Sequence, residues 1–250
     1  MELKDFFVEH PKVAIAFSGG TDSAYLLYAA KQYAKEVQAY FVKTAFQPQF
    51  EIDDALCLAK ELCVQMKMIP LDILSDEKII SNSYDRCYYC KKRILTAIID
   101  QAKIDGFSVL LDGTNASDEA DDRPGMKALR ELSVNSPLRL YGLTKDEIRR
   151  LSKEANLFTW NKPAYACLAT RIPTGQPIES RFLKRTEIAE DYMFSLGFFD
   201  FRIRTVGETA KIQISEGDIP LLIKNRKRIL NKLIENYESV CLDLEVRNEN

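Results

Sequence analysis

The chain has 250 residues, 46% of them hydrophobic, which is the composition of an ordinary globular protein with one large or two modest domains. Its 35 basic residues nearly balance its 37 acidic ones, so the net charge of -2 provides no general attraction to nucleic acid or to an anionic membrane. The sequence contains no signal-peptide hydrophobic region and no apolar run of the roughly 18 residues needed to cross a bilayer. We therefore expect a cytoplasmic protein whose six cysteines are reduced and available for metal, cluster or redox chemistry.

Short β-prone runs alternate with segments of helix length through the first two-thirds of the chain. This order predicts an α/β fold, a parallel sheet with crossover helices, in which ligands bind at the carboxyl ends of the strands. The last of these helices begins with a capping box formed by Thr144 and Glu147. The predicted strands are 13–17, 37–42, 66–71 and 108–111, and the predicted helices are 23–34, 52–64, 91–104 and 144–155.

The residue composition changes at 161–176, where prolines and a glycine indicate a long, functional loop. Beyond it we predict a small α+β domain. The predictions are therefore two domains, 1–175 and 176–250, the second serving substrate binding or oligomerisation. The elements expected in it are a helix at 181–195, strands at 199–206 and 210–215 joined by a turn at Gly207, a helix at 219–234 and a strand at 240–246.

A loop of small residues, 18–23, lies between the first predicted strand and the first predicted helix. Glycines let a backbone approach an anion closely, hydroxyl groups add hydrogen-bond donors, and the helix dipole favours negative charge, so we expect a phosphate site. An Asp inside such a loop indicates a cation that accompanies the phosphates, for which Mg²⁺ is the natural candidate. The residues of this predicted ATP site are Ser18, Gly19, Gly20, Thr21, Asp22 and Ser23, joined by Gly113 and Thr114 at the end of another strand.

Three of the six cysteines lie near polar motifs rather than in apolar patterns. Cys87 and Cys90 are separated by two tyrosines ahead of a predicted helix, and Cys167 lies in the long loop. A structural zinc site usually has four ligands, and the single histidine, His10, does not complete one. A [4Fe-4S] cluster held by three thiolates fits the ligand count better, because its fourth iron stays open to an exogenous sulfide. The competing interpretation makes Cys167 itself a nucleophile or sulfur donor, activated by the charge of Arg171.

Taken together, these motifs resemble the LarE family of sulfur transferases, which help to build the nickel-pincer nucleotide of lactate racemase. The loop at 18–23 matches the SGGxDS signature of PP-loop ATP pyrophosphatases, the superfamily. The family-level motifs are the segments 85–91, 113–115, 163–171 and 201–204. The resemblance spans nearly the whole chain and implies a PP-loop ATP pyrophosphatase domain over 1–175.

The resemblance implies ATP-dependent adenylation of a carboxylate of pyridinium-3,5-biscarboxylic acid mononucleotide, release of pyrophosphate, and replacement of AMP by sulfur. The implied cofactors are ATP, Mg²⁺ and a [4Fe-4S] cluster. Family members with one loop cysteine sacrifice its sulfur, whereas those with three are thought to carry sulfide on the cluster. The sequence favours the cluster form, and the implied catalytic residues are Cys167, Asp22 and Ser23, with Cys87, Cys90 and Cys167 as cluster ligands.

Two arginines, Arg202 and Arg204, alternate along a predicted strand, so both point to one face and are suited to bind a phosphate. The resemblance likewise implies that this pair, with Arg171, binds the phosphate of the substrate mononucleotide. Family position alone suggests Glu190 and Asp218 as metal or substrate contacts. The implied partners are the small-molecule nucleotide, sulfide or a sulfur-donor protein, and further copies of the chain in a homo-oligomer, with no membrane.

Several other functions have to be weighed against this one. A tRNA thiolase of the same superfamily would use nearly the same chemistry, but the acidic net charge and the single short basic run at 224–228 disfavour nucleic acid as the acceptor. A non-catalytic sensor of ATP or of a cluster would bind nucleotide without releasing pyrophosphate. An amidotransferase would leave the cysteines unexplained.

Overall fold

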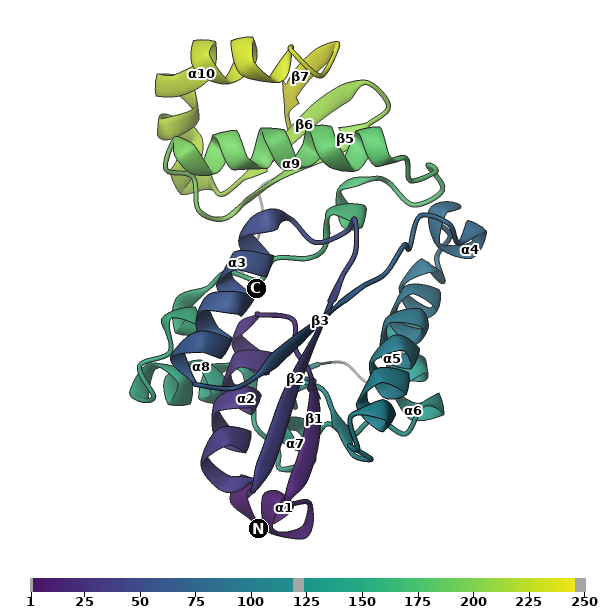
Figure 1. Cartoon of the computed structure of the whole chain (residues 1–250). Coiled ribbons are helices and arrows are strands. Elements are labelled where there is room, and N and C mark those ends of the chain that lie inside the picture. The colour runs from purple at the N-terminus through teal and green to yellow at the C-terminus, as the bar shows by residue number, and fades with distance from the viewer. Residues whose placement is uncertain (1, 119–123, 246–250) are drawn as a thin grey trace. The chain divides into compact units, whose positions relative to one another are not determined.

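The computed structural model describes residues 2–118 and 124–245, which form two compact units (Figure 1). The first unit comprises the residues up to Ile73 together with Asp85–Ala164, and the second comprises Leu74–Tyr84 and the residues from Tyr165 onward. The chain thus passes between the units three times. None of the helices in the described ranges is long and apolar enough to cross a membrane.

The first unit is built around a four-stranded sheet with the strand order β3-β2-β1-β4. All three strand pairings are parallel, as predicted, and in the central pair Val13 lies opposite Val37 and Ala16 opposite Tyr40. The carboxyl ends of the strands therefore meet at one edge of the sheet. The strands are β1 (Lys12–Ala16), β2 (Glu36–Lys43), β3 (Met66–Pro70) and β4 (Leu110–Leu111).

Helices cover both faces of this sheet (Figure 1), and the residues of β1 explain why. Val13 and Ile15 pack with one group of helices, whereas Ala14 packs with the other, so both sides of the strand are buried. The sequence patterns do not predict α1, α6 or α7. On the first face lie α1 (Leu3–Glu9), α2 (Thr21–Tyr33), α3 (Gln49–Glu61), α7 (Pro137–Leu140) and α8 (Lys145–Glu154); on the second lie α5 (Arg86–Ile104) and α6 (Pro124–Glu131).

The second unit contains a three-stranded sheet with the order β5-β6-β7, in which β5 and β6 are antiparallel and β6 and β7 are parallel. The predicted turn at Gly207 joins β5 to β6 and has the positive φ of +54° that favours glycine. Val246, the end of the last predicted strand, lies outside the described residues. The elements are α4 (Glu77–Ile80), α9 (Ser180–Ser195), β5 (Phe201–Val206), β6 (Thr209–Ile214), α10 (Ile219–Leu233) and β7 (Ser239–Leu242).

The predicted division after residue 175 differs from these compact units, and hydrogen bonds of Asn82 supply the reason. The buried amide of Asn82 donates to the carbonyls of Pro173 and Gln176 at 2.8 and 2.9 Å. The carbonyl of Asn82 accepts a hydrogen bond from the N–H of Gly175. The segment 74–84, far from this loop in sequence, is therefore part of the second unit.

Replacing Asn82 by Ala is expected to loosen the turn that its amide holds. Two half-buried carbonyls would lose their donor, and each such hydrogen bond contributes about 0.5–1.5 kcal/mol. Hydrogen exchange of the Gly175 N–H measures the effect, and we expect its opening free energy to fall by about 2 kcal/mol. Asn156→Ala is the matched control, since Asn156 shares the positive φ (55° against 54° at Asn82) but is exposed. Equal protection in the two variants would contradict the prediction.

Candidate active site

The loop at 18–23 leads from β1 into α2 at the carboxyl edge of the parallel sheet, as the sequence predicts. Gly20 is the N-cap of α2, and Gly19 has a φ of +76°. A Cβ at Gly19 would lie 3.1 Å from the Cβ of Ala55 on α3, so glycine is favoured there by both conformation and space. The loop thus places the start of a 13-residue helix, with its unpaired N–H groups, at the ligand-binding edge.

The hydroxyl groups of this loop have distinct roles. Ser18 is exposed, and its Oγ lies 3.1 Å from the Oγ of Ser23, which also donates to the carbonyl of Gly20 at 3.0 Å. Thr21 is buried and donates to the carbonyl of Thr159 at 2.9 Å, in the 3-10 turn η1 (Phe158–Asn161). Ser18 therefore faces solvent, while Thr21 anchors the start of α2.

The loop that follows β4 packs directly against the start of α2. A Cβ at Gly113 would lie 2.8 Å from the backbone nitrogen of Ser23 and 3.1 Å from its Cα. Next to it, Asp112 is buried, and its carboxylate accepts hydrogen bonds from Ser136 at 2.5 Å and Thr114 at 2.6 Å. The predicted ATP residues Gly113 and Thr114 thus lie beside the 18–23 loop.

The carboxylate of Asp22 has one partnered and one unpartnered oxygen. Its Oδ2 lies 2.7 Å from the Nζ of Lys145, the first residue of α8. Its Oδ1 is buried and has no hydrogen-bond partner among the described residues. A carboxylate oxygen without a donor suits a bound cation, so Asp22 fits the predicted role of a Mg²⁺ ligand.

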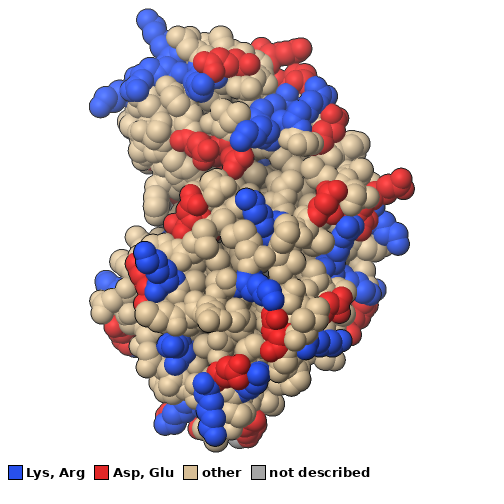
Figure 2. Space-filling model, viewed as in Figure 1, with Lys and Arg blue, Asp and Glu red and all other residues tan. Residues whose placement is uncertain are grey.

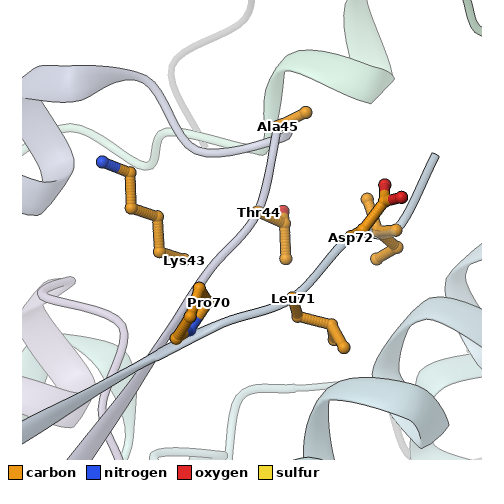
Figure 3. Close-up of a pocket in the computed structure, with 7 residues that line it drawn as sticks. Lys43, Thr44, Ala45, Pro70, Leu71 and Asp72 are labelled. Atoms are coloured by element: carbon orange, nitrogen blue, oxygen red, sulfur yellow. The ribbon is translucent and has the colours of Figure 1, made fainter.

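A cavity of about 450 Å³ lies at the same edge of the sheet, where β2 and β3 end (Figure 3). Its volume is in the range of small-molecule sites. The side chains of Pro70 and Leu71 give it apolar walls, and Thr44 and Asp72 add polar groups. Its lining also includes Lys43, Ala45 and Ile73.

The first unit also holds Cys87 and Cys90, and here one expectation from the sequence was wrong. The helix predicted to begin near Lys91 begins at Arg86, so both cysteines belong to α5. Residues three apart in a helix share a face. Cys87 is exposed and Cys90 half-buried.

In the second unit, Cys167 is the N-cap of the 3-10 turn η2 (Leu168–Arg171). Its side chain is half-buried, and its carbonyl accepts hydrogen bonds from the backbone N–H and the hydroxyl of Thr170 at 2.9 and 2.8 Å. The predicted long loop is therefore ordered around this cysteine by its own backbone.

A buried ion pair fixes the end of that turn. The Nε of Arg171, whose side chain is 0% exposed, lies 2.6 Å from Oε1 of Glu190 on α9. Oε2 of Glu190 accepts a 2.5 Å hydrogen bond from Tyr165, and Oε1 accepts the N–H of Ile203 at 2.9 Å. Glu190 thereby ties the two ends of the segment around Cys167 to α9 and to β5.

The environment of Arg171 keeps it charged. Burial works against the charge, but the Glu190 carboxylate more than offsets this and raises the pKa of Arg171. Another of its nitrogens donates to the hydroxyl of Thr170 at 2.9 Å. Its predicted contact with a substrate phosphate stays a prediction, and its burial against Glu190 favours a role in holding the Cys167 loop.

The predicted arginine pair lies on β5, where Arg202 and Arg204 are half-buried and alternate with buried Phe201 and Ile203. The two arginines thus share one face of the strand, as predicted. Arg204 donates to Gln213 at 2.6 Å and to the carbonyl of Thr170 at 3.3 Å, which places it beside the Cys167 turn.

The residues suggested by family position alone have structural partners. Glu190 belongs to the buried ion pair, and Asp218 accepts a hydrogen bond from Ser215 at 3.0 Å. Within the described residues, no group of three or more His, Cys, Asp or Glu side chains is gathered as a metal site. Cys87 and Cys90 belong to one unit and Cys167 to the other.

Comparison with known proteins identifies the family. A family model described as queuosine biosynthesis protein QueC matches residues 12–86. The chain is 34% identical to the pyridinium-3,5-bisthiocarboxylic acid mononucleotide synthase of Lactiplantibacillus plantarum, over 93% of this chain and 86% of the synthase. The chain belongs to the LarE family. It is also 31% identical to an uncharacterised protein of Synechocystis sp., over 97% and 92% of the two chains, and 29% identical to a tRNA-specific 2-thiouridylase of Pseudothermotoga lettingae, over 83% and 71%.

Membership of the LarE family confirms the predicted α/β PP-loop fold with a small C-terminal sheet. It also confirms the prediction that the protein is an ATP-using enzyme of the sulfur-transferase kind.

Sequence reasoning missed two contacts of the site. Lys145 is recognisable from sequence only as part of a capping box, and nothing local indicates that it reaches Asp22. The pairing of Glu190 with Arg171 likewise leaves no local signal.

Replacing Gly113 by Ala is expected to disturb the phosphate loop. The new Cβ would lie 2.8 Å from the nitrogen of Ser23, so the start of α2 must shift. We expect ATP affinity, measured by calorimetry, to fall at least about tenfold, with a loss of about 1–3 kcal/mol in stability. Gly217→Ala is the control, because a Cβ there meets only the Ser215 hydroxyl, at 3.9 Å. Unchanged ATP affinity in the Gly113 variant would show that the close packing is dispensable.

Replacing Glu190 by Gln leaves the buried Arg171 charge unpaired, which costs about 3–5 kcal/mol. Urea unfolding followed by circular dichroism measures this loss, and the reaction rate of Cys167 with a thiol reagent is expected to rise as its turn loosens. Glu154→Gln is the control, since Glu154 forms an exposed pair with Arg150, at 59% and 61% exposure, worth about 0.5 kcal/mol or less. Similar stability losses in the two variants would contradict the anchoring role.

Proposed function

We propose that the protein adenylates a carboxylate of pyridinium-3,5-biscarboxylic acid mononucleotide with ATP and then replaces AMP by sulfur. The observation that carries this proposal is the PP loop at the helix α2, with Asp22 and the Gly113 loop beside it, in a chain 34% identical to a synthase of the bisthiocarboxylate. The reducing cytoplasm, where free thiols persist, is the compartment that fits this chemistry.

In the first step, an oxygen of the substrate carboxylate attacks the α-phosphorus of ATP. The bond from that phosphorus to the bridging oxygen of the β-phosphate breaks, and pyrophosphate leaves with the electron pair. No general base is needed, because the carboxylate is already ionised and nucleophilic. The backbone N–H groups at the start of α2, with Asp22 holding Mg²⁺, would stabilise the charge on the phosphates.

In the second step, a sulfur nucleophile attacks the carbonyl carbon of the acyl adenylate. The bond from that carbon to the phosphate oxygen breaks, AMP leaves, and a thiocarboxylate remains. Arg202 and Arg204 are proposed to bind the phosphate of the substrate mononucleotide from their shared face of β5. Arg171 is proposed to position Arg204 relative to the Cys167 turn. Both arginines donate to Thr170, Arg171 to its hydroxyl and Arg204 to its carbonyl.

We propose Cys87, Cys90 and Cys167 as the ligands of a [4Fe-4S] cluster. The first two share a face of α5, and a helix that presents two thiols on one face suits thiolate ligation. The segment of the second unit that hydrogen-bonds the Cys167 loop ends at Tyr84, shortly before Cys87 in the sequence. When bound, the cluster would supply an iron with an open position for sulfide.

The decisive experiment reconstitutes the protein anaerobically with iron and sulfide and then adds ATP, Mg²⁺ and the biscarboxylate mononucleotide. Product mass and protein mass are measured together. We expect repeated turnover, one AMP and one pyrophosphate per thiocarboxylate, and an unchanged protein mass. Loss of one sulfur and two hydrogens from the protein per product would make Cys167 a sacrificial donor instead. Product formed on tRNA but not on the mononucleotide would overturn the proposed substrate.

Cysteine variants separate cluster ligation from folding. Cys87→Ser, Cys90→Ser and Cys167→Ser are each expected to lower the iron content and to abolish repeated turnover. Cys57→Ser, Cys63→Ser and Cys241→Ser are the controls, since these exposed thiols are not proposed ligands. A Cys167 variant that still turns over many times would exclude it as an essential ligand.

The proposal names a small-molecule acceptor, and the net charge of -2 supports it over tRNA. On the face of the molecule shown in Figure 2, basic and acidic side chains are interspersed in the first unit, and the groups of adjoining basic side chains in the second unit have acidic side chains beside them. Recognition of a nucleic-acid backbone relies on clustered positive charge. Tight, salt-sensitive tRNA binding would be the contrary result.

A further inference from the structure

The PP loop contains no basic residue. Loops of the Walker type include a lysine that reaches the β- and γ-phosphates, whereas the 18–23 loop offers only small and hydroxyl residues and the negatively charged Asp22. A triphosphate with several negative charges, placed beside a carboxylate, needs positive charge close by. The structure shows where the chain provides one.

Lys145 brings a cation to this loop from a distant part of the chain, 123 residues away from Asp22 in sequence. Its backbone is fixed independently of its side chain. The N–H of Lys145 donates to the hydroxyl of Ser117 at 3.0 Å, and the capping box of Thr144 and Glu147 holds the start of α8. The side chain therefore extends from a rigid base.

The ammonium group of Lys145 is placed at the phosphate loop but is not buried there. Its Nζ lies 2.7 Å from Oδ2 of Asp22, and the two side chains are 32% and 24% exposed. An ion pair that remains accessible to solvent can add a further ligand without leaving its partner, because an ammonium group has three donors. Oδ1 of Asp22, buried and without a hydrogen-bond partner among the described residues, stays available for a metal.

A second lysine at this edge of the sheet is less well placed. Lys91 lies 3.4 Å from Asp112, which follows β4 and is not part of the PP loop. Asp112 already accepts hydrogen bonds from Ser136 and Thr114. Among the lysines of the described residues, it is Lys145 whose ion pair is with a residue of the loop itself.

We propose that Lys145 is the phosphate-binding cation of this PP loop. It contacts the β- or γ-phosphate of ATP through a free donor while it holds Asp22 by Oδ2, so that Oδ1 faces the metal. The inference rests on the proposed function, since it takes the ligand of the loop to be the triphosphate of ATP. It assigns to Lys145 both a binding role and a positioning role.

The test is calorimetric titration of the intact protein with ATP, pyrophosphate and AMP, each with Mg²⁺ and with a chelator. Lys145→Met is expected to weaken ATP and pyrophosphate binding about ten- to hundredfold, the effect of losing a charge-assisted hydrogen bond, and to do so without Mg²⁺ as well. AMP, which lacks the distal phosphates, is expected to change by about threefold or less. Lys145→Arg keeps the charge and is expected to retain most of the affinity.

Two controls separate phosphate binding from stability and from neutralisation of Asp22. Lys67→Met removes an ion pair with Asp105 of similar length, 2.9 Å, and is expected to leave all three affinities unchanged. Thermal unfolding of each variant reports its folding. In the double variant Asp22→Asn with Lys145→Met, pyrophosphate affinity is expected to stay low, because the cation is still missing.

Several results would overturn the inference. Wild-type affinity of Lys145→Met for pyrophosphate would do so, as would recovery in the double variant, which would show that Lys145 only neutralises Asp22. An equal loss for AMP and ATP would indicate a structural role. Loss of pyrophosphate binding in Lys145→Met, in a protein that never adenylates the mononucleotide, would instead contradict the proposed function and support this inference.

Discussion

The phosphate site depends on one close contact, the packing of the Gly113 backbone against the first turn of α2. At 2.8 Å from the Ser23 nitrogen there is no room for a Cβ, so the loop after β4 and the loop after β1 are held in one arrangement. The buried Asp112, which precedes Gly113, then accepts hydrogen bonds from the buried Thr114 and the half-buried Ser136. A rigid backbone is what electrostatic catalysis requires, since donors that are already oriented need not reorganise during the reaction.

The second unit holds its cysteine in a different way, with a buried charge pair in place of close backbone packing. A buried ion pair often adds little net stability, yet removing one partner is costly, so such pairs fix geometry. Glu190 contacts residues on both sides of Cys167, namely Tyr165 and Arg171, and also the backbone of β5. The arrangement sets the turn on both sides of the half-buried Cys167.

Structural features that depend on neighbouring residues could be predicted from the sequence, whereas contacts between distant segments could not. The β-prone runs and the capping box of Thr144 gave most of the strands and α8, and the 18–23 loop was recognisable because its conformation is encoded by its own glycines. The start of α5 was misplaced, because Cys-Tyr-Tyr-Cys has modest helix propensity and tertiary packing overrides it. The ion pairs of Asp22 with Lys145 and of Arg171 with Glu190 join distant segments, so no periodicity indicates them. The hydrogen bonds of Asn82 likewise join distant segments, and they attach 74–84 to the second unit, which the sequence did not indicate.

The two proposed half-reactions make different demands, and the chain meets them with different units. Activation of a carboxylate needs fixed donors and cations, and the residues proposed for it lie in the helices and loops at the carboxyl edge of the parallel sheet of the first unit. Sulfur transfer needs a soft nucleophile, and the thiols proposed for it come from both units. The segment 74–84 is hydrogen-bonded to the loop after Cys167 and continues directly into Asp85 and Cys87, so it lies next in sequence to the first pair of proposed thiols. A substitution that loosens this segment is therefore expected to affect sulfur transfer more than pyrophosphate release, because the residues proposed for pyrophosphate release all lie in the first unit.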